Sequence, residues 1–408
     1  MSLDFSLTPE QEEIRNLAHD FAVNEMRPKA AYFDEHEETP WDAMKKAHDL
    51  GIGPSAGFPV EYGGGGVDLI TQMILSEELS WGDAGMAVAI NASGLAGAGI
   101  LAMGTEEQKK KYIGMLSDPA QLRLGAMGLT EPNSGSDSMA LETLATPVDG
   151  GYRLNGVKQF CTNGGIADIQ VVFATLDRSL GAAGVTAFVV EKGTPGMSQG
   201  RKERKLGVRA SHTAQVIFED CFVPAEARLG YDRDGNATGP GAVGAMMMLE
   251  ATRPMVAAGA IGIARAAFEF ARDYALERQQ FGRPIAKQEA VAFKLADMAT
   301  EIDAARLLAW RAAWMAANQI PLARGEGSMA KLFAGDMAMR VTVEAVQILG
   351  GYGYIKEYPV ERFMRDAKIY QIWEGTAEIQ RLVISRYLLG EWRARSVARP
   401  EGQKTPVG

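Results

Sequence analysis

The spacing of hydrophobic and polar residues predicts that the first third of the chain is helical. The segment from Thr8 to Gln11 is typical of a helix start, because an N-cap hydroxyl precedes a proline and a glutamine follows three residues after the cap. A glycine-rich loop is expected from Gly51 to Gly66. Further helices are predicted over Asp68 to Gly82, Asp83 to Met103 and Thr105 to Leu116.

The middle of the chain has a different pattern. Between Gly125 and Pro224 the apolar runs are short and are bounded by Gly, Asn and Asp, which predicts strands separated by turns. Clear examples are Ile169 to Thr175, Thr186 to Glu191 and Gln215 to Glu219. Strands flanked on both sides by helices favour an α+β protein with a separate β domain.

The last part of the chain returns to helix. Apolar residues three and four positions apart form two stripes: Leu295, Met298, Ile302, Ala305, Ala309 and Ala312, and then Phe333, Met337, Val341, Ala345 and Ile348. The second stripe ends at Gly350-Gly351, a helix stop. Long amphipathic helices of this kind fit an antiparallel bundle.

One uncharged stretch, Ala84 to Thr105, is long enough to cross a membrane. Its many Gly and Ala residues, with Asn91 and Ser93, lower the drive for insertion, so a helix packed inside a core is favoured. The segment from Met1 to Asp20 is acidic and resembles neither a secretory signal nor a transit peptide. We therefore expect a cytoplasmic protein with no membrane span.

Composition narrows the function classes. The 408 residues include 42 Lys and Arg against 51 Asp and Glu, a net charge of −9, which argues against nucleic-acid binding but leaves room for a local phosphate pocket. Cys161 and Cys221 are too few for a disulfide framework and fit a reducing compartment. The four histidines show no ligand spacing, so no metal is expected.

A glycine motif from Gly239 to Gly244 matches the pattern G-x-G-x-x-G. That pattern binds a dinucleotide only between a strand and a helix in a βαβ unit. Here a polar turn precedes it and a long helix follows, so an NAD-type Rossmann enzyme is not supported.

Three loops are candidates for binding, and each has a structural alternative. Thr130 to Asp137 could hold a phosphate or a polar cofactor edge, or could be an ordinary turn. Phe160 to Gly165 could pack against a planar ring, or could be a core aromatic followed by an Asn-Gly turn. Arg278 to Gly282 could bind phosphate, or Arg278 could complement a helix dipole.

The segment from Trp373 to Thr376 is the most suggestive. Glu374 lies among apolar neighbours, here Tyr370, Ile372 and Trp373, which would prepare its carboxylate to act as a base near neutral pH. Gly375 breaks the chain and Thr376 can cap the next helix. The alternative is a glutamate on the rim of a loop.

Taken together and in order, these segments resemble the acyl-CoA dehydrogenase family, and look closest to its medium-chain branch. The similarity extends to Leu388 and includes further segments: Ser76-Glu77-Glu78-Leu79, Lys109-Lys110-Lys111-Tyr112, Thr252-Arg253-Pro254, Gln347-Ile348-Leu349-Gly350-Gly351 and Met364-Arg365-Asp366-Ala367-Lys368-Ile369-Tyr370. The resemblance implies an N-terminal all-helical domain over residues 1–124, a middle β-barrel or sandwich domain over 125–236, and a C-terminal four-helix bundle over 237–408. It also implies non-covalent FAD and a homotetramer, a dimer of dimers in which a neighbouring subunit completes each FAD site.

The resemblance further implies roles for individual residues. The expected FAD contacts are Met127, Leu129, Thr130, Ser136, Phe160, Cys161, Thr162, Arg278, Gln280, Phe281, Gln288, Gln347, Gly350, Gly351, Thr376 and Glu378. Of these, Arg278 and Gln347 to Gly351 would serve the FAD of a neighbouring subunit. The expected acyl-CoA contacts are Ser136, Glu250, Arg253 and Gly375.

The implied reaction is the dehydrogenation of an acyl-CoA thioester to trans-2-enoyl-CoA. Glu374 would take the α proton while the β hydride leaves to flavin N5, with donors aimed at the thioester oxygen stabilising the enolate charge. Electrons would then pass to electron-transfer flavoprotein. Two alternatives remain: an oxidase of the same fold that uses O₂, and a CoA-binding helical protein without turnover.

The chain departs from the family pattern at several positions. Asn133 and Ser134 replace Gly and Ala, Glu250 replaces Asp, and the loop between Leu176 and Val185 is short. Some branches place the base just before the Arg of the CoA site; Thr252 stands there, which favours Glu374. Small residues near Ser80 to Ala98 suggest a short or medium acyl chain, and the sequence does not fix its length or branching.

Overall fold

Side-chain caps set the starts of several N-terminal helices in this computed structural model, which describes residues 5–232, 236–237 and 242–397. The hydroxyl of Thr8 accepts a hydrogen bond from the backbone N–H of Gln11, and the Gln11 side chain accepts one from the Thr8 N–H, which confirms the predicted capping box. The helices of this part are α1 (Pro9–Phe21), α2 (Arg27–His36), α3 (Trp41–Asp49), α4 (Leu69–Gly82), α5 (Ala84–Asn91), α6 (Ser93–Met103) and α7 (Glu106–Leu116). A π-helical turn, η1 (Ala22–Met26), joins α1 to α2, and the expected loop from Gly51 to Gly66 holds two short 3₁₀ turns, η2 (Pro54–Gly57) and η3 (Val60–Tyr62).

The helix expected over Asp83 to Met103 is two helices, divided at Ala92. The break is flanked by Asn91 and Ser93, whose short polar side chains compete with backbone hydrogen bonding. The Ser93 hydroxyl accepts a hydrogen bond from the Gly125 N–H at 3.0 Å, so it ties this point to the first strand.

Two stretches are long and apolar enough to cross a membrane by length and composition, Ala84–Met103 and Thr252–Glu277. In this structure 56 % and 67 % of their most apolar windows are buried inside the protein. The first stretch therefore packs into a core, as the sequence favours.

The middle part is one seven-stranded, mostly antiparallel sheet that curls. The strand order is β1-β4-β2-β3-β7-β6, with β5 paired to β4. The strands are β1 (Gly125–Gly128), β2 (Leu144–Val148), β3 (Gly151–Thr162), β4 (Ile169–Thr175), β5 (Val185–Glu191), β6 (Met197–Lys202) and β7 (Thr213–Pro224). All seven residues of β4 are buried, which explains why that strand reads as a continuous apolar run in the sequence.

Long helices form the C-terminal part. They are α8 (Ala242–Glu277), α9 (Glu289–Ala317), α10 (Glu326–Leu349), the shorter α11 (Val360–Ala367) and α12 (Ala377–Val397). The two predicted apolar stripes lie in α9 and α10, and Gly350, with φ 61°, ends α10. Helix α10 packs against α8, α9 and α12. The glycine motif from Gly239 to Gly244 begins outside the described residues, and helix α8 starts inside it, at Ala242.

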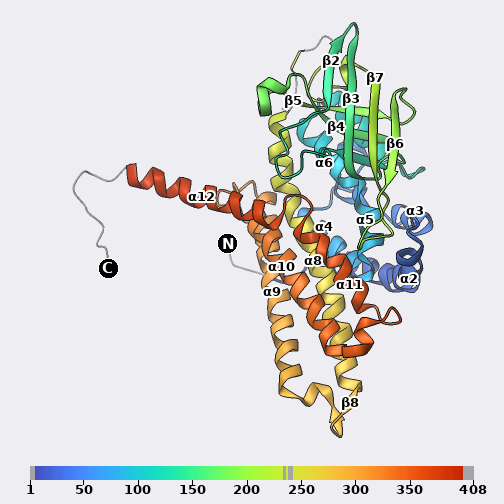
Figure 1. The fold of residues 1–408 in the computed structure, drawn as a ribbon, viewed down its shortest axis with the longest axis vertical. Helices are drawn as coiled ribbons and strands as arrows, with labels where there is room; N and C mark the ends of the chain where they lie inside the picture. Colours follow the sequence, from blue (N-terminus) through green and yellow to red (C-terminus); the bar gives the residue numbers. More distant parts are fainter. Residues whose placement is uncertain (1–4, 233–235, 238–241, 398–408) are drawn as a thin grey trace.

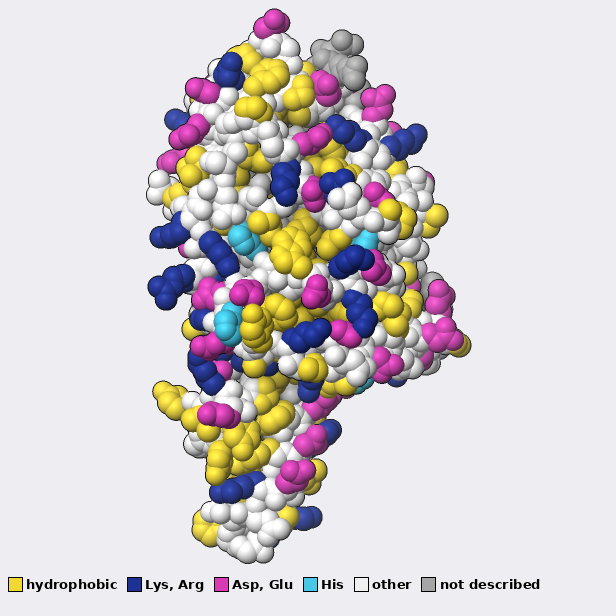
Figure 2. Space-filling model, turned by 90° about the vertical axis from the view of Figure 1, so that its right-hand side faces the viewer, with side chains coloured by type: hydrophobic (Ala, Val, Ile, Leu, Met, Phe, Trp, Pro, Cys, Tyr) yellow, Lys and Arg dark blue, Asp and Glu magenta, His cyan; other side chains and the backbone are white. Residues whose placement is uncertain are grey.

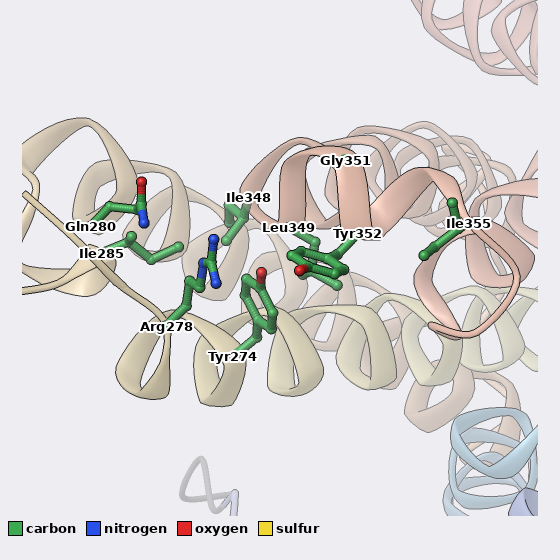
Figure 3. Close-up of a pocket in the computed structure, with 9 residues that line it drawn as sticks. All are labelled: Tyr274, Arg278, Gln280, Ile285, Ile348, Leu349, Gly351, Tyr352 and Ile355. Atoms are coloured by element: carbon green, nitrogen blue, oxygen red, sulfur yellow. The ribbon is translucent and has the colours of Figure 1, made fainter.

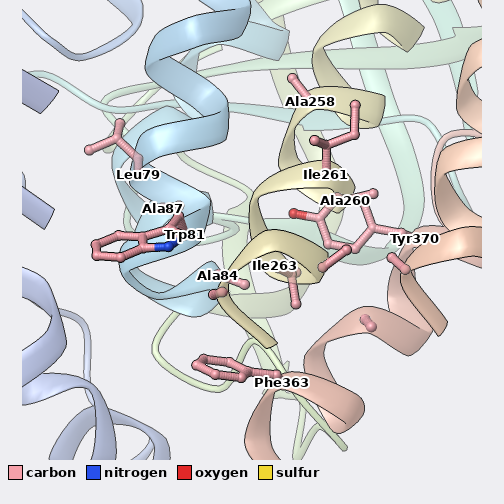
Figure 4. Close-up of a cluster of buried hydrophobic side chains, with 14 of the residues drawn as sticks. Leu79, Trp81, Ala84, Ala87, Ala258, Ala260, Ile261, Ile263, Phe363 and Tyr370 are labelled. Atoms are coloured by element: carbon pink, nitrogen blue, oxygen red, sulfur yellow. The ribbon is translucent and has the colours of Figure 1, made fainter. Parts of the chain in front are cut away.

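Figure 1 shows how the three parts are arranged: the sheet lies at one end, the long C-terminal helices extend to the other, and the N-terminal helices lie beside both. Helix α8 links the parts because it packs against α4 and α6 as well as α9 and α10. Figure 4 shows Leu79 and Trp81 of α4 and Ala260 and Ile261 of α8 in the same buried cluster as Tyr370.

A buried charge network reinforces the contact between α4 and α8. Arg265 of α8 donates to the carboxylates of Glu77 and Glu78, both at 2.8 Å, and Arg306 of α9 also contacts Glu77. Burial alone would raise the pKa of Glu78, but the hydrogen bonds and charge of Arg265 hold it below its ordinary value. On the face drawn in Figure 2, by contrast, basic and acidic groups are interspersed with apolar side chains.

Candidate active site and its separate binding regions

Glu374 lies in a tight loop between the 3₁₀ turn η8 (Lys368–Gln371) and helix α12. Its backbone is left-handed, with φ 50°, and Gly375 follows with φ 92°. Left-handed backbone is costly for a residue with a side chain, and such strain clusters at functional sites. The φ of Gly375 favours glycine at the second position of the loop, and a Cβ there would also lie 2.5 Å from Nε2 of Gln380, which would have to move.

The Glu374 carboxylate faces helix α8. Oγ1 of Thr252 lies 3.2 Å from Oε2 of Glu374 and donates to it. Burial raises the pKa of Glu374, while the Thr252 hydrogen bond and the charges of Lys331 and Arg253 oppose that rise. A carboxylate with a raised pKa and a hydrogen-bonded oxygen suits the role of a general base.

Two side chains that the sequence reasoning missed hold the backbone of this loop. Gln380 of α12 donates through Nε2 to the carbonyl oxygens of Glu374 and Gly375, at 3.2 and 3.0 Å. Lys331 of α10 donates through Nζ to the Gly375 carbonyl at 2.7 Å. A signal for Lys331 exists in the sequence, because it shares a helix face with the small residues Ala334 and Ala338.

The expected apolar surroundings of Glu374 are present in part. Tyr370 is buried, and its ring meets that of Trp373 edge-on with centroids 4.8 Å apart. Ile372 is 49 % exposed, so it contributes less than its sequence position suggests. Arg253 is buried, and its Nη1 donates to Oγ of Ser328 at 2.8 Å.

A second group of predicted residues lies at the C-terminal ends of strands β1 and β3. The N–H of Gln159 donates to the Thr130 carbonyl at 2.8 Å, so the loop after β1 and the end of β3 come together. Phe160 has φ 56°, and its ring is 62 % exposed. Cys161 is buried in the sheet's own core, and burial raises its thiol pKa to about 12, so only its backbone could face a cofactor.

A buried ion pair anchors the same loop. Nζ of Lys158 lies 2.5 Å from Oε1 of Glu131, and neither side chain is exposed to solvent by more than 1 %. Glu131 also accepts hydrogen bonds from the N–H groups of Glu142 and Thr143. At the positions that depart from the family pattern, Oγ of Ser134 donates to the Asp137 carbonyl and Asn133 contacts Glu142. These bonds fix the backbone of the loop that follows Thr130.

A third group lines a cleft of about 420 Å³ at the far end of α8. Figure 3 shows Tyr274, in the last turn of α8, and Arg278, which follows α8, pointing toward Ile348 near the end of α10. Tyr352, Gly351 and Gln280 line the same cleft. Gln347 and Gly350 are exposed at the adjoining end of α10. Phe281 is 93 % exposed with φ 55°, and Gln288 accepts a hydrogen bond from Arg283.

Helix geometry separates this third group from Glu374. Thr252, which touches Glu374, and Arg278, which directly follows α8, are 26 positions apart, which is about 39 Å at 1.5 Å per residue. An extended FAD does not span that distance. The two groups therefore cannot hold the same cofactor molecule within one chain.

The other predicted residues are scattered around these groups. Met127 and Leu129 are half-buried, Ser136 and Glu378 are exposed, and Oγ1 of Thr376 accepts from the Ile379 N–H at the start of α12. Glu250 lies in α8, but its side chain is outside the described residues. The short loop after Leu176 is a 3₁₀ segment, η4 (Arg178–Gly184).

A helical part, a curled sheet and a second helical part, with a strained acidic loop before α12 and an exposed aromatic ring on β3, agree with the three-part fold that the sequence resemblance implies. The chain belongs to the acyl-CoA dehydrogenase family: the family's N-terminal, middle and C-terminal domains match residues 8–118, 126–221 and 239–389. The protein is thus an oxidoreductase, and FAD is its cofactor.

The chain is similar to short-chain members of the family. It is 46 % identical to the short-chain specific acyl-CoA dehydrogenase of Clostridium acetobutylicum, over 94 % of this chain and 99 % of that protein. Butyryl-CoA dehydrogenase from Megasphaera elsdenii superposes with a TM-score of 0.89 at 45 % identity, over 95 % and 100 % of the two chains. A chain from a structure described as the electron transferring flavoprotein of Acidaminococcus fermentans gives 0.89 at 44 %, with the same coverage. The expected medium-chain branch is not confirmed by these relatives, two of which are named as short-chain or butyryl-CoA enzymes.

The residues present fit FAD. Phe160 and Phe281 both hold an exposed aromatic ring on left-handed backbone, and such strained positions cluster at sites that bind ligands. Arg278, in the third group, offers a guanidinium of the kind that binds phosphate.

Proposed function

We propose that this protein dehydrogenates a short-chain acyl-CoA to the trans-2-enoyl-CoA, with Glu374 as the base. The observation that carries the proposal is the Glu374 loop, whose half-buried carboxylate accepts a hydrogen bond from Thr252 and has a raised pKa. The short acyl chain is supported by the names of the most similar relatives.

Glu374 removes the proton from the carbon next to the thioester carbonyl. Loss of this proton builds negative charge on the thioester oxygen, and the family resemblance assigns the Glu374 N–H as one donor to that oxygen. The α C–H bond breaks toward Glu374 as the β C–H bond breaks with its electron pair, so a double bond forms between the two carbons. Bound FAD supplies the acceptor for that hydride at N5 of its isoalloxazine ring.

We further propose that two chains build each FAD site. The Glu374 group and the sheet group of one chain would form one half, and the Arg278 group of a neighbouring chain would form the other. Thr130, Phe160 and Thr162 would face the flavin ring, and Arg278, Gln280 and Gln347 would hold the phosphates and adenosine of a neighbouring subunit's FAD. A homotetramer in the cytoplasm and electron-transfer flavoprotein as the electron acceptor complete the proposal.

Replacing Glu374 with glutamine tests the role of the base. Glu374→Gln keeps the size of the side chain but removes its basic charge, so FAD and acyl-CoA should still bind. Stopped-flow flavin bleaching under anaerobic conditions should be slower by about 10²–10⁴-fold or more. Glu357→Gln, which alters an exposed carboxylate before α11, is the matched control. Bleaching of Glu374→Gln within about threefold of wild type would show that another residue is the base.

The same assay tests the substrate and the acceptor. Across a panel of acyl-CoAs, bleaching should be fastest with short chains. Rapid aerobic formation of peroxide by the reduced protein would instead support the O₂-using alternative.

A further inference from the structure

Lys331 is an unusual residue to find beside a catalytic loop. It lies on the buried face of α10 with 1 % of its surface exposed, although lysine is almost never fully buried unless it is paired. Its ammonium group donates to the Gly375 carbonyl at 2.7 Å. Burying an ammonium is costly, so this contact is expected to contribute more than packing.

The lysine acts on a strained piece of backbone. Glu374 and Gly375 both have left-handed backbone. Gln380 donates hydrogen bonds to the carbonyl oxygens of both residues. Lys331 adds a third hydrogen bond from a different helix. Donors from α10 and α12 thus hold both peptide groups, and with them the direction of the Glu374 side chain.

Charged side chains nearby shift the pKa values of both Glu374 and Lys331. The Lys331 and Arg253 charges lower the pKa of Glu374 against the effect of burial. Lys331 in turn faces the charges of Glu374, Arg253, Asp336 and Glu378, and burial lowers its own pKa to about 8. At neutral pH the lysine is therefore mostly protonated and places a positive charge near the base.

We propose that Lys331 is a positioning residue for the reaction: its ammonium holds the Glu374–Gly375 turn in the geometry for proton abstraction and places a positive charge near the Glu374 carboxylate. The proposal rests on the function proposed for Glu374. It assigns to a buried lysine a task in catalysis that reaches the substrate only through Glu374.

The test compares variants that remove the charge, the hydrogen bond, or both. Lys331→Met removes both, so flavin bleaching at the pH-independent plateau should fall at least about tenfold, as expected when a reacting group is misplaced. The rate of flavin bleaching falls at low pH as Glu374 is protonated, and in Lys331→Met this acidic limb should move to higher pH, because the Glu374 carboxylate loses a stabilising positive charge. Gln380→Met removes a neutral donor to the same carbonyls, so it should lower the plateau and leave the limb in place. Lys294→Met is the control, since Lys294 pairs with Glu344 between α9 and α10.

A second readout does not depend on turnover. Because the pKa of Lys331 is about 8 when folded and 10.5 when exposed, the folded state releases this proton at lower pH than the unfolded state. Wild-type stability should therefore rise between these values relative to Lys331→Met, as measured by urea unfolding. If Lys331→Met does not fold, Lys331→Gln, which keeps a donor without the charge, should still move the acidic limb.

The outcomes separate this proposal from the one on which it rests. A Lys331→Met protein with bleaching within twofold of wild type and an unmoved limb would overturn the role of Lys331, even if Glu374→Gln is inactive. Normal bleaching by Glu374→Gln would instead overturn the function proposed for Glu374.

Discussion

Thr252 and Glu374 reach the same point from two different elements. Thr252 projects from α8 and Glu374 from the loop before α12, and their side-chain oxygens are 3.2 Å apart. A carboxylate on either residue would therefore face the same small region. Either α8 or the loop before α12 could therefore supply the base, provided that its carboxylate reaches this region.

This geometry predicts that the base can be moved. Glu374→Gly should abolish rapid flavin bleaching, and adding Thr252→Glu should restore part of it, because the new carboxylate enters from α8. Bleaching by stopped flow should exceed that of Glu374→Gly alone by at least about tenfold, within the range assigned to a positioned base. Adding Thr300→Glu, on the exposed face of α9, is the control and should restore nothing. Equal rates for the two double variants would contradict the prediction.

At the scale of elements, the loop after β1 depends on the buried pair between Glu131 and Lys158. Removing one partner leaves the other as an uncompensated buried charge, which costs about 3–5 kcal/mol. Lys158→Met should thus lower the free energy of unfolding by about this amount, and adding Glu131→Leu should recover much of it. Urea unfolding measures both, and the exposed pair Lys45 with Asp49 should contribute less than about 1 kcal/mol.

The same pair gives this contribution a pH dependence. Burial raises the pKa of Glu131, but the charge and hydrogen bond of Lys158 outweigh this effect and hold the pKa below its ordinary value. A carboxyl with a lowered folded pKa stabilises the protein at neutral pH, and this contribution is lost as the pH falls through that value. The wild type should therefore lose more stability than the double variant on acidification, and parallel curves would contradict the assignment.

Local patterns were sufficient to predict most elements. The cap at Thr8 and the apolar run of β4 depend on neighbours in the sequence, and both appear where expected. The division at Ala92 was missed: the polar residues Asn91 and Ser93 beside it are visible in the sequence, but the bond from Gly125 to Ser93, 32 residues apart, is not. The domain limits at residues 124 and 236 stay predictions.

The residues of the candidate site also fall into two classes: those that the local sequence predicts and those whose contacts are long-range. Glu374, Gly375 and Thr376 could be found from their order, because a glycine and a capping threonine shape the loop locally. For Lys331 the sequence indicates a place on the buried face of α10 but not its partner, since Gly375 is 44 residues away and the contact exists only once α10 packs against the loop before α12. Long-range polar contacts of this kind have no periodicity in the sequence.

At the scale of the whole molecule, the length of α8 decides how the cofactor site is built. Glu374 and Arg278 belong to regions about 39 Å apart along that helix. Exposed aromatic residues accompany the Arg278 cleft, among them Phe281 and Tyr354. Such a surface fits contact with a second copy of the chain, which would bring Arg278 to a neighbour's FAD.

Subunit complementation follows from this geometry. Arg278→Ala should weaken FAD binding, and Glu374→Gln should block flavin bleaching, so each variant alone is inactive at limiting FAD. In a mixed dimer the Arg278→Ala chain keeps its Glu374 and receives Arg278 from its partner, so one of the two sites is intact. If the two chains mix at random, half of the dimers are mixed, and co-expression should restore about one quarter of wild-type bleaching. Mixing the purified proteins without subunit exchange is the control. If Arg278 served the FAD of its own chain, no intact site would form, and bleaching after co-expression would stay at the level of the separate variants.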